Sequence, residues 1–402
     1  MECIHCSLTT TNRNSKTNTK DVIGTAGTKE ILGAISEAGK NVRTVCIGGI
    51  NASTVQRVMF QSSHSSKSLD GVAIVSAIIA AEDPEQASRN LLTLVKSPPP
   101  FAKDTIAIAT SSINLGDAKQ LSQLVQASGE VVHRVAGKSP LSHNMTNLVV
   151  QNFAANVALA VGGSPIMANY GEEAEDLAKL RGSLVINMGT VTPDGLLNYT
   201  KALKAYNLAG GSVVFDPVGG GATSVRRNAI KTLMAAGYFD VIKGNEGEIS
   251  TVFGTVVQQR GVDSGPSTST FTEKATMVRD LALRERNVVV MTGATDIISD
   301  GFRTLAVKNG HELLGRITGS GCVLGTTISV MLAVSKEDKL VATLAALLHY
   351  EIAAEIAAAR SDVKGPGTFV PALIDELYNI QKASQEKDTS WIEKAKVEPV
   401  VL

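Results

Sequence analysis

The chain has 402 residues, of which 44% are hydrophobic, and its 38 basic and 38 acidic side chains cancel to a net charge of zero. This length favours two domains, and the balanced charge and the low aromatic content of 4% argue against surfaces for nucleic acids or anionic membranes. Four cysteines, no apolar run of roughly 18 residues and a polar start to the chain indicate neither a disulfide framework, nor a membrane span, nor a signal peptide, so we expect a cytoplasmic protein.

The first hundred residues alternate between predicted strands and helices. The stretch 1–20 is polar and has no periodicity. Glycine or serine ends each of the two predicted strands, as in β/α barrels that bind phosphate at these ends. The predicted helices are 28–38, 52–60 and 84–96, and the predicted strands are 42–47 and 71–76.

A proline-rich break, Ser97-Pro98-Pro99-Pro100-Phe101, follows this region and predicts an extended linker. We therefore place a first domain at 1–97, a linker at 98–115 and a second domain at 116–402. Residues 104–114 fit either a further strand of the first domain or part of the junction.

The second domain repeats apolar strands and helices so regularly that we predict a doubly wound, mainly parallel sheet. We expect polar loops at 139–147 and 259–272, and a short hairpin after 288–293. The chain after 323 is expected to be mostly helical. The predicted helices are 116–129, 148–161, 193–207, 226–236 and 323–334, and the predicted strands follow 163 and lie at 184–188, 212–215, 240–243 and 288–293.

A glycine-rich stretch, Gly319-Ser320-Gly321-Cys322, stands directly before the apolar helix at 323–334. Small residues let consecutive N–H groups point in one direction, and the helix N-terminus adds a positive dipole end, so the stretch can cradle phosphate oxygens. Cys322 would lie in the first helical turn, where we expect a lowered thiol pKa. The alternative is a simple turn into a buried helix, with Cys322 as a small core residue.

Further polar residues fall at the predicted carboxyl ends of strands, where open α/β sheets bind ligands. They comprise one cation, two carboxylates suited to Mg²⁺ and two smaller polar side chains, namely Lys243, Asp216, Glu248, Asn245 and Thr292. Together they suit phosphoryl transfer from a nucleotide, which depends on positioning and charge neutralisation. Taken singly, Asp216 could mark a turn, Lys243 a surface charge and Glu248 a helix cap.

The order of these motifs resembles the ribokinase-like fold and, within it, the hydroxyethylthiazole kinase family, from Gly116 to about Gln385. The resemblance rests on Met145-Thr146-Asn147, Gly163-Ser164-Pro165-Ile166-Met167, Asn187-Met188-Gly189-Thr190, Asp216-Pro217-Val218, Lys243-Gly244-Asn245 with Glu248, Gly261-Val262-Asp263-Ser264, Gly319-Ser320-Gly321-Cys322 and Gly365-Pro366-Gly367-Thr368-Phe369.

The resemblance implies that the alcohol of hydroxyethylthiazole attacks the γ-phosphoryl group of MgATP. Cys322, where many kinases of this fold have an aspartate, would orient the alcohol or take its proton. The implied binding residues are Met167, Asn147 and Gly319 for the thiazole, Lys243, Thr292, Asn245 and Gly321 for ATP, and Asp216 and Glu248 for Mg²⁺. Relatives form trimers or hexamers, which would let Met145–Asn147 and Met167 come from one subunit and Cys322 from its neighbour. Two alternatives stay open: a kinase for another small alcohol such as hydroxymethylpyrimidine, and a non-catalytic thiazole- or nucleotide-binding regulator.

The first domain resembles the C-terminal part of thiamine phosphate synthase, as in fungal bifunctional thiamine enzymes. The matching pieces are Ile47-Gly48-Gly49-Ile50, Val75-Ser76-Ala77-Ile78 and either Thr17-Asn18-Thr19-Lys20 or Arg13-Asn14-Ser15-Lys16. The resemblance implies that Gly49, Val75 and Ser76 hold the thiazole phosphate. Eight βα units need about 200 residues, so we expect an incomplete β/α barrel without synthase activity.

Overall fold

The computed structural model describes residues 2–5, 23–64, 67–102, 118–255 and 269–402. The chain divides into two compact units, Met1–Lys103 with Met234–Tyr238, and Asp104–Leu233 with Phe239–Leu402. The motifs expected at 13–20 and 261–264, and the segment 104–114, lie outside the described residues.

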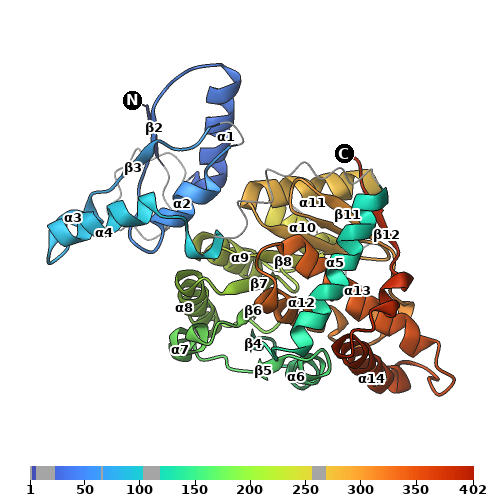
Figure 1. Cartoon of the computed structure of the whole chain (residues 1–402). Helices are drawn as coiled ribbons and strands as arrows, with labels where there is room; N and C mark the ends of the chain where they lie inside the picture. The colour runs from blue at the N-terminus through green and yellow to red at the C-terminus, as the bar shows by residue number, and fades with distance from the viewer. Residues whose placement is uncertain (1, 6–22, 65–66, 103–117, 256–268) are drawn as a thin grey trace. The chain divides into compact units, whose positions relative to one another are not determined.

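The first unit contains a small parallel sheet of three strands in the order β1 (Glu2–His5), β2 (Thr44–Ile47) and β3 (Gly71–Ala73). The helices around it are α1 (Gly24–Glu37), α2 (Val55–Gln61), α3 (Ser76–Ile79) and α4 (Pro84–Lys96), as Figure 1 shows. Their core includes Leu32, Cys46, Val58 and Leu91. Helix α4 has the predicted bounds because the Asp83 side chain accepts the Gln86 amide and Pro84 occupies the first position.

Two predictions for this unit are wrong in detail. A strand, β1, lies in the stretch 1–20, where we expected no element; its pairing with β2 supplies the stabilisation that its own composition does not. The strand predicted at 71–76 ends at Ala73, because the amides of Ile78 and Ile79 both bond to the carbonyl of Val75 and turn the chain into α3.

The second unit is built on one sheet of nine strands in the order β12-β11-β10-β9-β8-β7-β6-β4-β5. The strands from β5 to β9 pair in parallel, while β10, β11 and β12 add an antiparallel edge, so the prediction of a mainly parallel sheet is confirmed. The strands are β4 (Leu141–Met145), β5 (Ser164–Ile166), β6 (Ser183–Asn187), β7 (Ser212–Asp216), β8 (Val241–Asn245), β9 (Val288–Thr292), β10 (Asp296–Ser299), β11 (Thr304–Val307) and β12 (Val397–Pro399).

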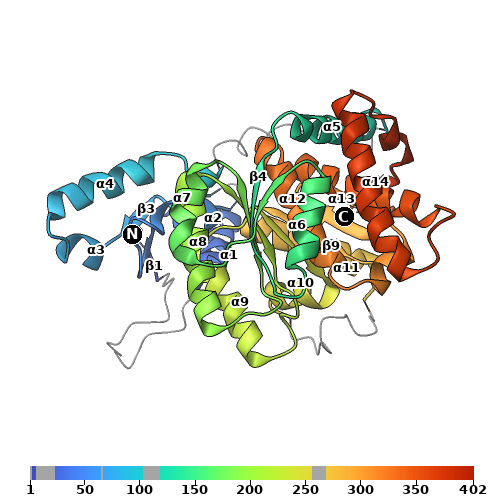
Figure 2. The same ribbon diagram turned by 90° about the horizontal axis from the view of Figure 1, so that it is seen from below.

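Helices cover both faces of this sheet, and Figure 2 shows α8 and α12 on opposite faces. Helix α12 crosses β4, β6 and β7, and α13 packs between α12, α14 and α5. The helices are α5 (Ala118–Ala136), α6 (Gln151–Ala160), α7 (Ala174–Lys179), α8 (Pro193–Ala209), α9 (Ser224–Ala236), α10 (Glu246–Phe253), α11 (Phe271–Glu285), α12 (Ser320–Val334), α13 (Lys339–Ala358) and α14 (Pro366–Gln385).

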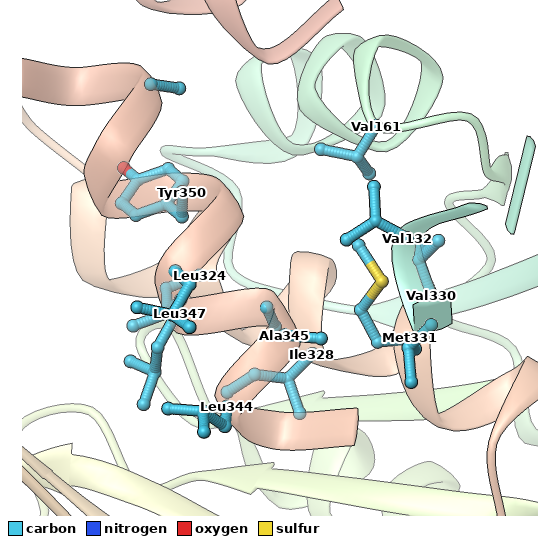
Figure 3. Close-up of a cluster of buried hydrophobic side chains, with 14 of the residues drawn as sticks. Val132, Val161, Leu324, Ile328, Val330, Met331, Leu344, Ala345, Leu347 and Tyr350 are labelled. Carbon is cyan, nitrogen blue, oxygen red and sulfur yellow. The ribbon is translucent and has the colours of Figure 1, made fainter. Parts of the chain in front are cut away.

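The main core lies between the sheet and these helices. Alternate strand residues such as Val185, Val214 and Val290 face α12 and α13, in keeping with the two-residue period of a strand. Figure 3 shows Ile328 and Met331 of α12 in the same cluster as Leu344 of α13. Helix α12 is buried along most of its length from Val323 onward, and its first turn is bonded to β8 through Lys243 and the Gly321 carbonyl.

One strand was mistaken for a loop. We expected a polar loop at 139–147, yet β4 runs from Leu141 to Met145 between β5 and β6. Its polar side chains are buried and bonded across the core: Ser142 to Ser329, His143 to Tyr206 and Asn144 to Thr326. This satisfied polar network lets a strand without hydrophobic alternation lie inside the sheet.

Other elements were absent from the prediction, namely α7, α11 and β12. Helix α11 begins at Phe271, inside the excursion expected at 259–272, because Thr270 and Glu273 form a capping box. By length and composition α13 would pass as a membrane span, contrary to our expectation that no run qualifies, but 89% of its most apolar window is buried inside the unit.

Candidate active site

The carboxyl ends of the central parallel strands meet at one edge of the sheet. Asn187 and Asp216, the last residues of β6 and β7, are direct partners in the ladder, and so are Asn245 of β8 and Thr292 of β9. The first turn of α12 reaches the same edge, since its Gly321 carbonyl accepts a bond from Lys243. Residues from the ends of four strands and from one helix therefore meet at this edge.

A buried ion pair lies at its centre. Lys243 Nζ is 3.1 Å from Asp216 Oδ1 and 2.9 Å from the Gly321 carbonyl oxygen, and the two side chains are only 4% and 0% exposed. Burial alone would lower the pKa of Lys243, but the neighbouring Asp216, Cys322 and Glu248 outweigh it and raise this pKa. Lys243 is therefore a fixed cation inside the site, and the alternative of a surface charge is wrong.

Asparagine amides connect this pair to the thiol. Asp216 Oδ2 accepts from Asn187 Nδ2 at 2.8 Å, and Asn187 Oδ1 accepts from Asn147 Nδ2 at 2.9 Å. The same Asn147 nitrogen donates to Cys322 Sγ at 3.4 Å. Asn147, Asn187, Asp216, Lys243 and Cys322 thus form one hydrogen-bonded ring, which the backbone of Gly321 closes.

The glycine-rich stretch is part of α12 itself. The helix begins at Ser320, three residues before the predicted start, with Gly319 as its N-cap at a φ of +89°. A Cβ at Gly319 would lie 2.4 Å from Cγ1 of Val150, so no other residue fits there without displacement. The Ser320 and Gly321 carbonyl oxygens accept hydrogen bonds from Tyr350 Oη and Lys243 Nζ. The first N–H groups of a helix have no acceptor within the helix, so those of this first turn can bind an anion.

Cys322 lies in the first turn of α12, as predicted, but its predicted acidity is wrong. Burial raises the pKa of this thiol to about 11, and the negative charge of Asp216 adds to the rise. Lys243, Asn187 and Asn147 oppose the rise without cancelling it. The helix dipole and the nearby cation therefore do not make Cys322 a thiolate in the unliganded protein.

Glu248 has two structural roles that fit the helix-cap alternative. Its Oε2 accepts the amide of Asn245 at 2.8 Å while Asn245 Oδ1 accepts the amide of Glu248, which forms the capping box of α10. Its Oε1 accepts the amide of Gly219, in the turn after β7, at 2.8 Å. Burial and the nearby Asp216 raise the pKa of Glu248 to about 7, so a cation beside these carboxylates would be favoured.

Met167 is not part of the ring. It follows β5, the edge strand, which lies three strands and roughly 14 Å from β7, and it packs against the main core. Asn147, in contrast, contacts Cys322 within the same chain, so the idea that these two residues come from different subunits is wrong.

Two residues of the site had no role in the sequence prediction. Asn187 lies at the centre of the amide bridge, and the only sequence signal was its position near a predicted strand end, in one of the motifs on which the resemblance rests. Arg226 of α9 donates to the carbonyls of Met188, Gly189 and Val218, and so clamps the turns after β6 and β7 together. No local sequence pattern predicts that an arginine will join two turns in this way.

A cation, two carboxylates and a helix N-terminus at the carboxyl edge of a parallel sheet are the parts needed to neutralise and position a transferring phosphoryl group. The fold and the site therefore define a ribokinase-like α/β kinase. Residues 132–383 match the model of the hydroxyethylthiazole kinase family. The chain belongs to this family.

Individual relatives agree with this assignment. The chain is 39% identical over 393 residues, 95% of its length and 73% of the relative's, to the "Probable thiamine biosynthetic bifunctional enzyme" of Schizosaccharomyces pombe. It is 45% identical over 247 residues, 61% of its length and 90% of the relative's, to the hydroxyethylthiazole kinase of Moorella thermoacetica. The solved structure of the hydroxyethylthiazole kinase protein from Pyrococcus horikoshii matches 68% of this chain and 99% of its own, with a TM-score of 0.60 and 38% identity.

Proposed function

We propose that this kinase transfers the γ-phosphoryl group of ATP to the primary alcohol of 4-methyl-5-(2-hydroxyethyl)thiazole, in thiamine biosynthesis. The observation that carries the proposal is the single ring in which Cys322 is bonded, through two asparagines, to the Asp216–Lys243 ion pair. Such a ring holds the group that faces the alcohol and the group that faces the phosphates in one rigid arrangement. Rigid positioning is the main source of rate in phosphoryl transfer.

ATP would bind along the edge from β8 to α12. Lys243 lies at this edge and has three N–H groups. Among the described residues two of them are bonded, to Asp216 and to the Gly321 carbonyl, and the third would bind a phosphate oxygen. Thr292 and Asn245 lie side by side at the ends of β9 and β8, and both would contact the nucleotide. The amides of the first turn of α12, including that of Gly321, would bind the phosphate oxygens.

The donor set fits Mg²⁺. Magnesium keeps several of its waters and binds proteins through one or two carboxylates together with substrate phosphates. Asp216 and Glu248 are the two carboxylates, and burial together with the charge of Asp216 raises the pKa of Glu248, so a cation beside them would be favoured. When bound, the ion would neutralise charge on the transferring group, while Asp216 and Glu248 would hold its water ligands.

The thiazole would lie between Asn147, Gly319 and Cys322, with Met167 contributing from the neighbouring subunit of a homo-oligomer. The distance of β5 from the ring supports a second subunit as the source of Met167. Leu148 and Val149, which follow Asn147, are 71% and 68% exposed, as expected of residues that a partner copy covers. We propose a trimer or hexamer in the cytosol, where Cys46 and Cys322 stay free.

The first unit is proposed to be an incomplete β/α barrel derived from thiamine phosphate synthase, at 1–97, joined through 98–115 to the kinase domain at 116–402. Gly49 lies in the turn after β2, and Val75 and Ser76 open α3, so all three follow strand ends where such barrels bind phosphate. A sheet of three described strands is far from a closed barrel. We propose that this three-stranded unit does not join the thiazole phosphate to a pyrimidine diphosphate, and a turnover assay that detects thiamine phosphate would refute this.

A substrate panel tests the kinase proposal. Purified protein is incubated with ATP, Mg²⁺ and either hydroxyethylthiazole or hydroxymethylpyrimidine, and ADP and phosphate ester are measured. We expect ester formation with a kcat/KM at least about tenfold higher for the thiazole. A preference for the pyrimidine would assign the other alcohol, and ligand binding by calorimetry without ADP release would favour a regulator.

A further inference from the structure

We propose that Asn187 is a positioning residue for the reaction, which couples Cys322 to the Asp216–Lys243 ion pair. The inference rests on the proposed kinase activity and deepens it. Asn187 is fully buried at the end of β6, and its amide is the side-chain link between the two halves of the site. The described alternative route between them runs only through the backbone of Gly321.

The orientation of the Asn187 amide is fixed by a neighbour that can only donate. The backbone N–H of Gly189 bonds to Asn187 Oδ1 at 2.9 Å, so this atom must be the oxygen. The nitrogen then faces Asp216 Oδ2, where it donates to a carboxylate. In a flipped amide the Asn187 N–H groups would face the N–H of Gly189, and the Asn187 oxygen would face the carboxylate of Asp216. Neither contact would be a hydrogen bond.

The orientation of Asn147 is fixed in the same way. The N–H of Val149 bonds to Asn147 Oδ1 at 3.1 Å, which leaves both N–H groups of Asn147 for Asn187 Oδ1 and Cys322 Sγ. The sulfur therefore accepts a hydrogen bond from a donor whose position depends on Asn187. Cys322 is thus held by Asn147, and Asn147 is held by Asn187.

The turn that carries Asn187 is itself rigid. Arg226 donates to the carbonyls of Met188 and Gly189 at 2.8 and 2.7 Å and to that of Val218 at 2.7 Å. Both Asn187 and Asp216 stand directly before the clamped turns. The backbone therefore fixes the distance between Asn187 and Asp216. Because Asn187 in turn holds Asn147, the same backbone fixes the position of Cys322.

A double-mutant cycle tests the coupling, with kcat as the readout. We expect Asn187→Leu to lower kcat by about 100-fold while the KM for the thiazole changes by less than about threefold, because positioning rather than binding is lost. In the Cys322→Ala background the same change should lower kcat by only about tenfold, because no thiol remains to be positioned. Equal factors in both backgrounds, or wild-type kcat in Asn187→Leu, would overturn the proposal.

Two controls keep the test decisive. Asn287→Leu replaces another buried asparagine, at the opposite end of β9, whose amide donates to the Phe239 carbonyl, and it should keep wild-type kcat. Asn187→Ser, in which water can replace the amide, serves if Asn187→Leu does not fold, and the same non-additivity is expected. If the wild type itself forms no thiazole phosphate, the proposed function fails; if it turns over and the cycle is additive, only the role of Asn187 fails.

The rate of Cys322 alkylation gives a readout besides activity. Loss of Asn187 removes the acceptor that holds the Asn147 amide in place, and so weakens the hydrogen bonding to Cys322 Sγ that favours the thiolate. The pH at which Cys322 is half-reactive should therefore rise in Asn187→Leu and stay unchanged in Asn287→Leu. Peptide mass spectrometry separates Cys322 from the other cysteines. A half-reactive pH that is the same in Asn187→Leu as in the wild type would contradict the coupling.

Discussion

Cys322 offers the most informative perturbation, because its position suggests a catalytic base and its surroundings do not. The thiol pKa is raised to about 11. At pH 8 only about one molecule in a thousand would then carry the thiolate. We therefore expect Cys322 to act as the neutral thiol, which orients the alcohol, and not as a pre-formed base.

The magnitudes follow from this role. Cys322→Ala removes one positioned polar group, and we expect kcat to fall by about 100-fold with little change in KM. Cys322→Ser retains a group that can donate and accept, so its kcat should stay within about tenfold of the wild type. Cys322→Asp places a carboxyl group, a stronger base than the neutral thiol, next to the Asn147 donor and near Lys243, and kcat should be kept or raised.

The assay is the steady-state release of ADP at saturating ATP and hydroxyethylthiazole, between pH 8 and 9.5. A neutral thiol predicts a kcat for the wild type that changes by less than about twofold over this range, whereas an obligatory thiolate predicts about a tenfold rise per pH unit. Such a rise would refute the orienting role. Cys322→Ala turning over at the wild-type rate would refute any role of the thiol.

Three further changes test other parts of the site. Lys243→Met leaves Asp216 buried without its cation, so urea unfolding should show a loss of about 3–5 kcal/mol, while Lys243→Arg should retain the fold and ATP binding. The pKa of Glu248 is raised from 4.5 to about 7, so the folded protein binds this proton more tightly than the unfolded chain does. The free energy of unfolding should therefore fall as the pH rises from about 4.5 to 7. This fall should be smaller in Glu248→Gln and in the presence of MgATP. Gly319→Ala forces a left-handed φ and a 2.4 Å contact with Val150, so thermal unfolding should show a loss of about 1–3 kcal/mol, and an unchanged Tm would contradict this conformation.

The sequence predicted best those elements whose stability depends on residues close together in the chain. Strands such as β7 and β9 are apolar runs that end in polar residues, and α4 and α8 begin with proline after a capping side chain, so their positions were predicted within one or two residues. Strand β4 was missed because its stability depends on bonds from Ser142, His143 and Asn144 to partners far along the chain. No window of local sequence contains those partners.

The site also divides into features that local sequence predicts and features that depend on the fold. Asp216, Lys243 and Cys322 were proposed as site residues because each lies at the end of a predicted strand or directly before a predicted helix, and the structure brings the three together. The hydrogen bonds of Asn187 and the clamp of Arg226 depend on how the turns after β6 and β7 meet, which only the fold shows. The thiol pKa was predicted in the wrong direction because burial, a tertiary property, outweighs the local effect of a helix N-terminus.

The central claim is that the ring of Asn147, Asn187, Asp216, Lys243 and Cys322 transfers a phosphoryl group to a thiazole alcohol. Phosphorus NMR of the full chain with ATP, Mg²⁺ and hydroxyethylthiazole measures this directly, with Lys243→Met as the inactive comparison. We predict that a phosphate monoester resonance and ADP appear together in equal amounts, and that neither forms at a comparable rate with the variant. Release of inorganic phosphate without ester, or binding without turnover, would contradict the account.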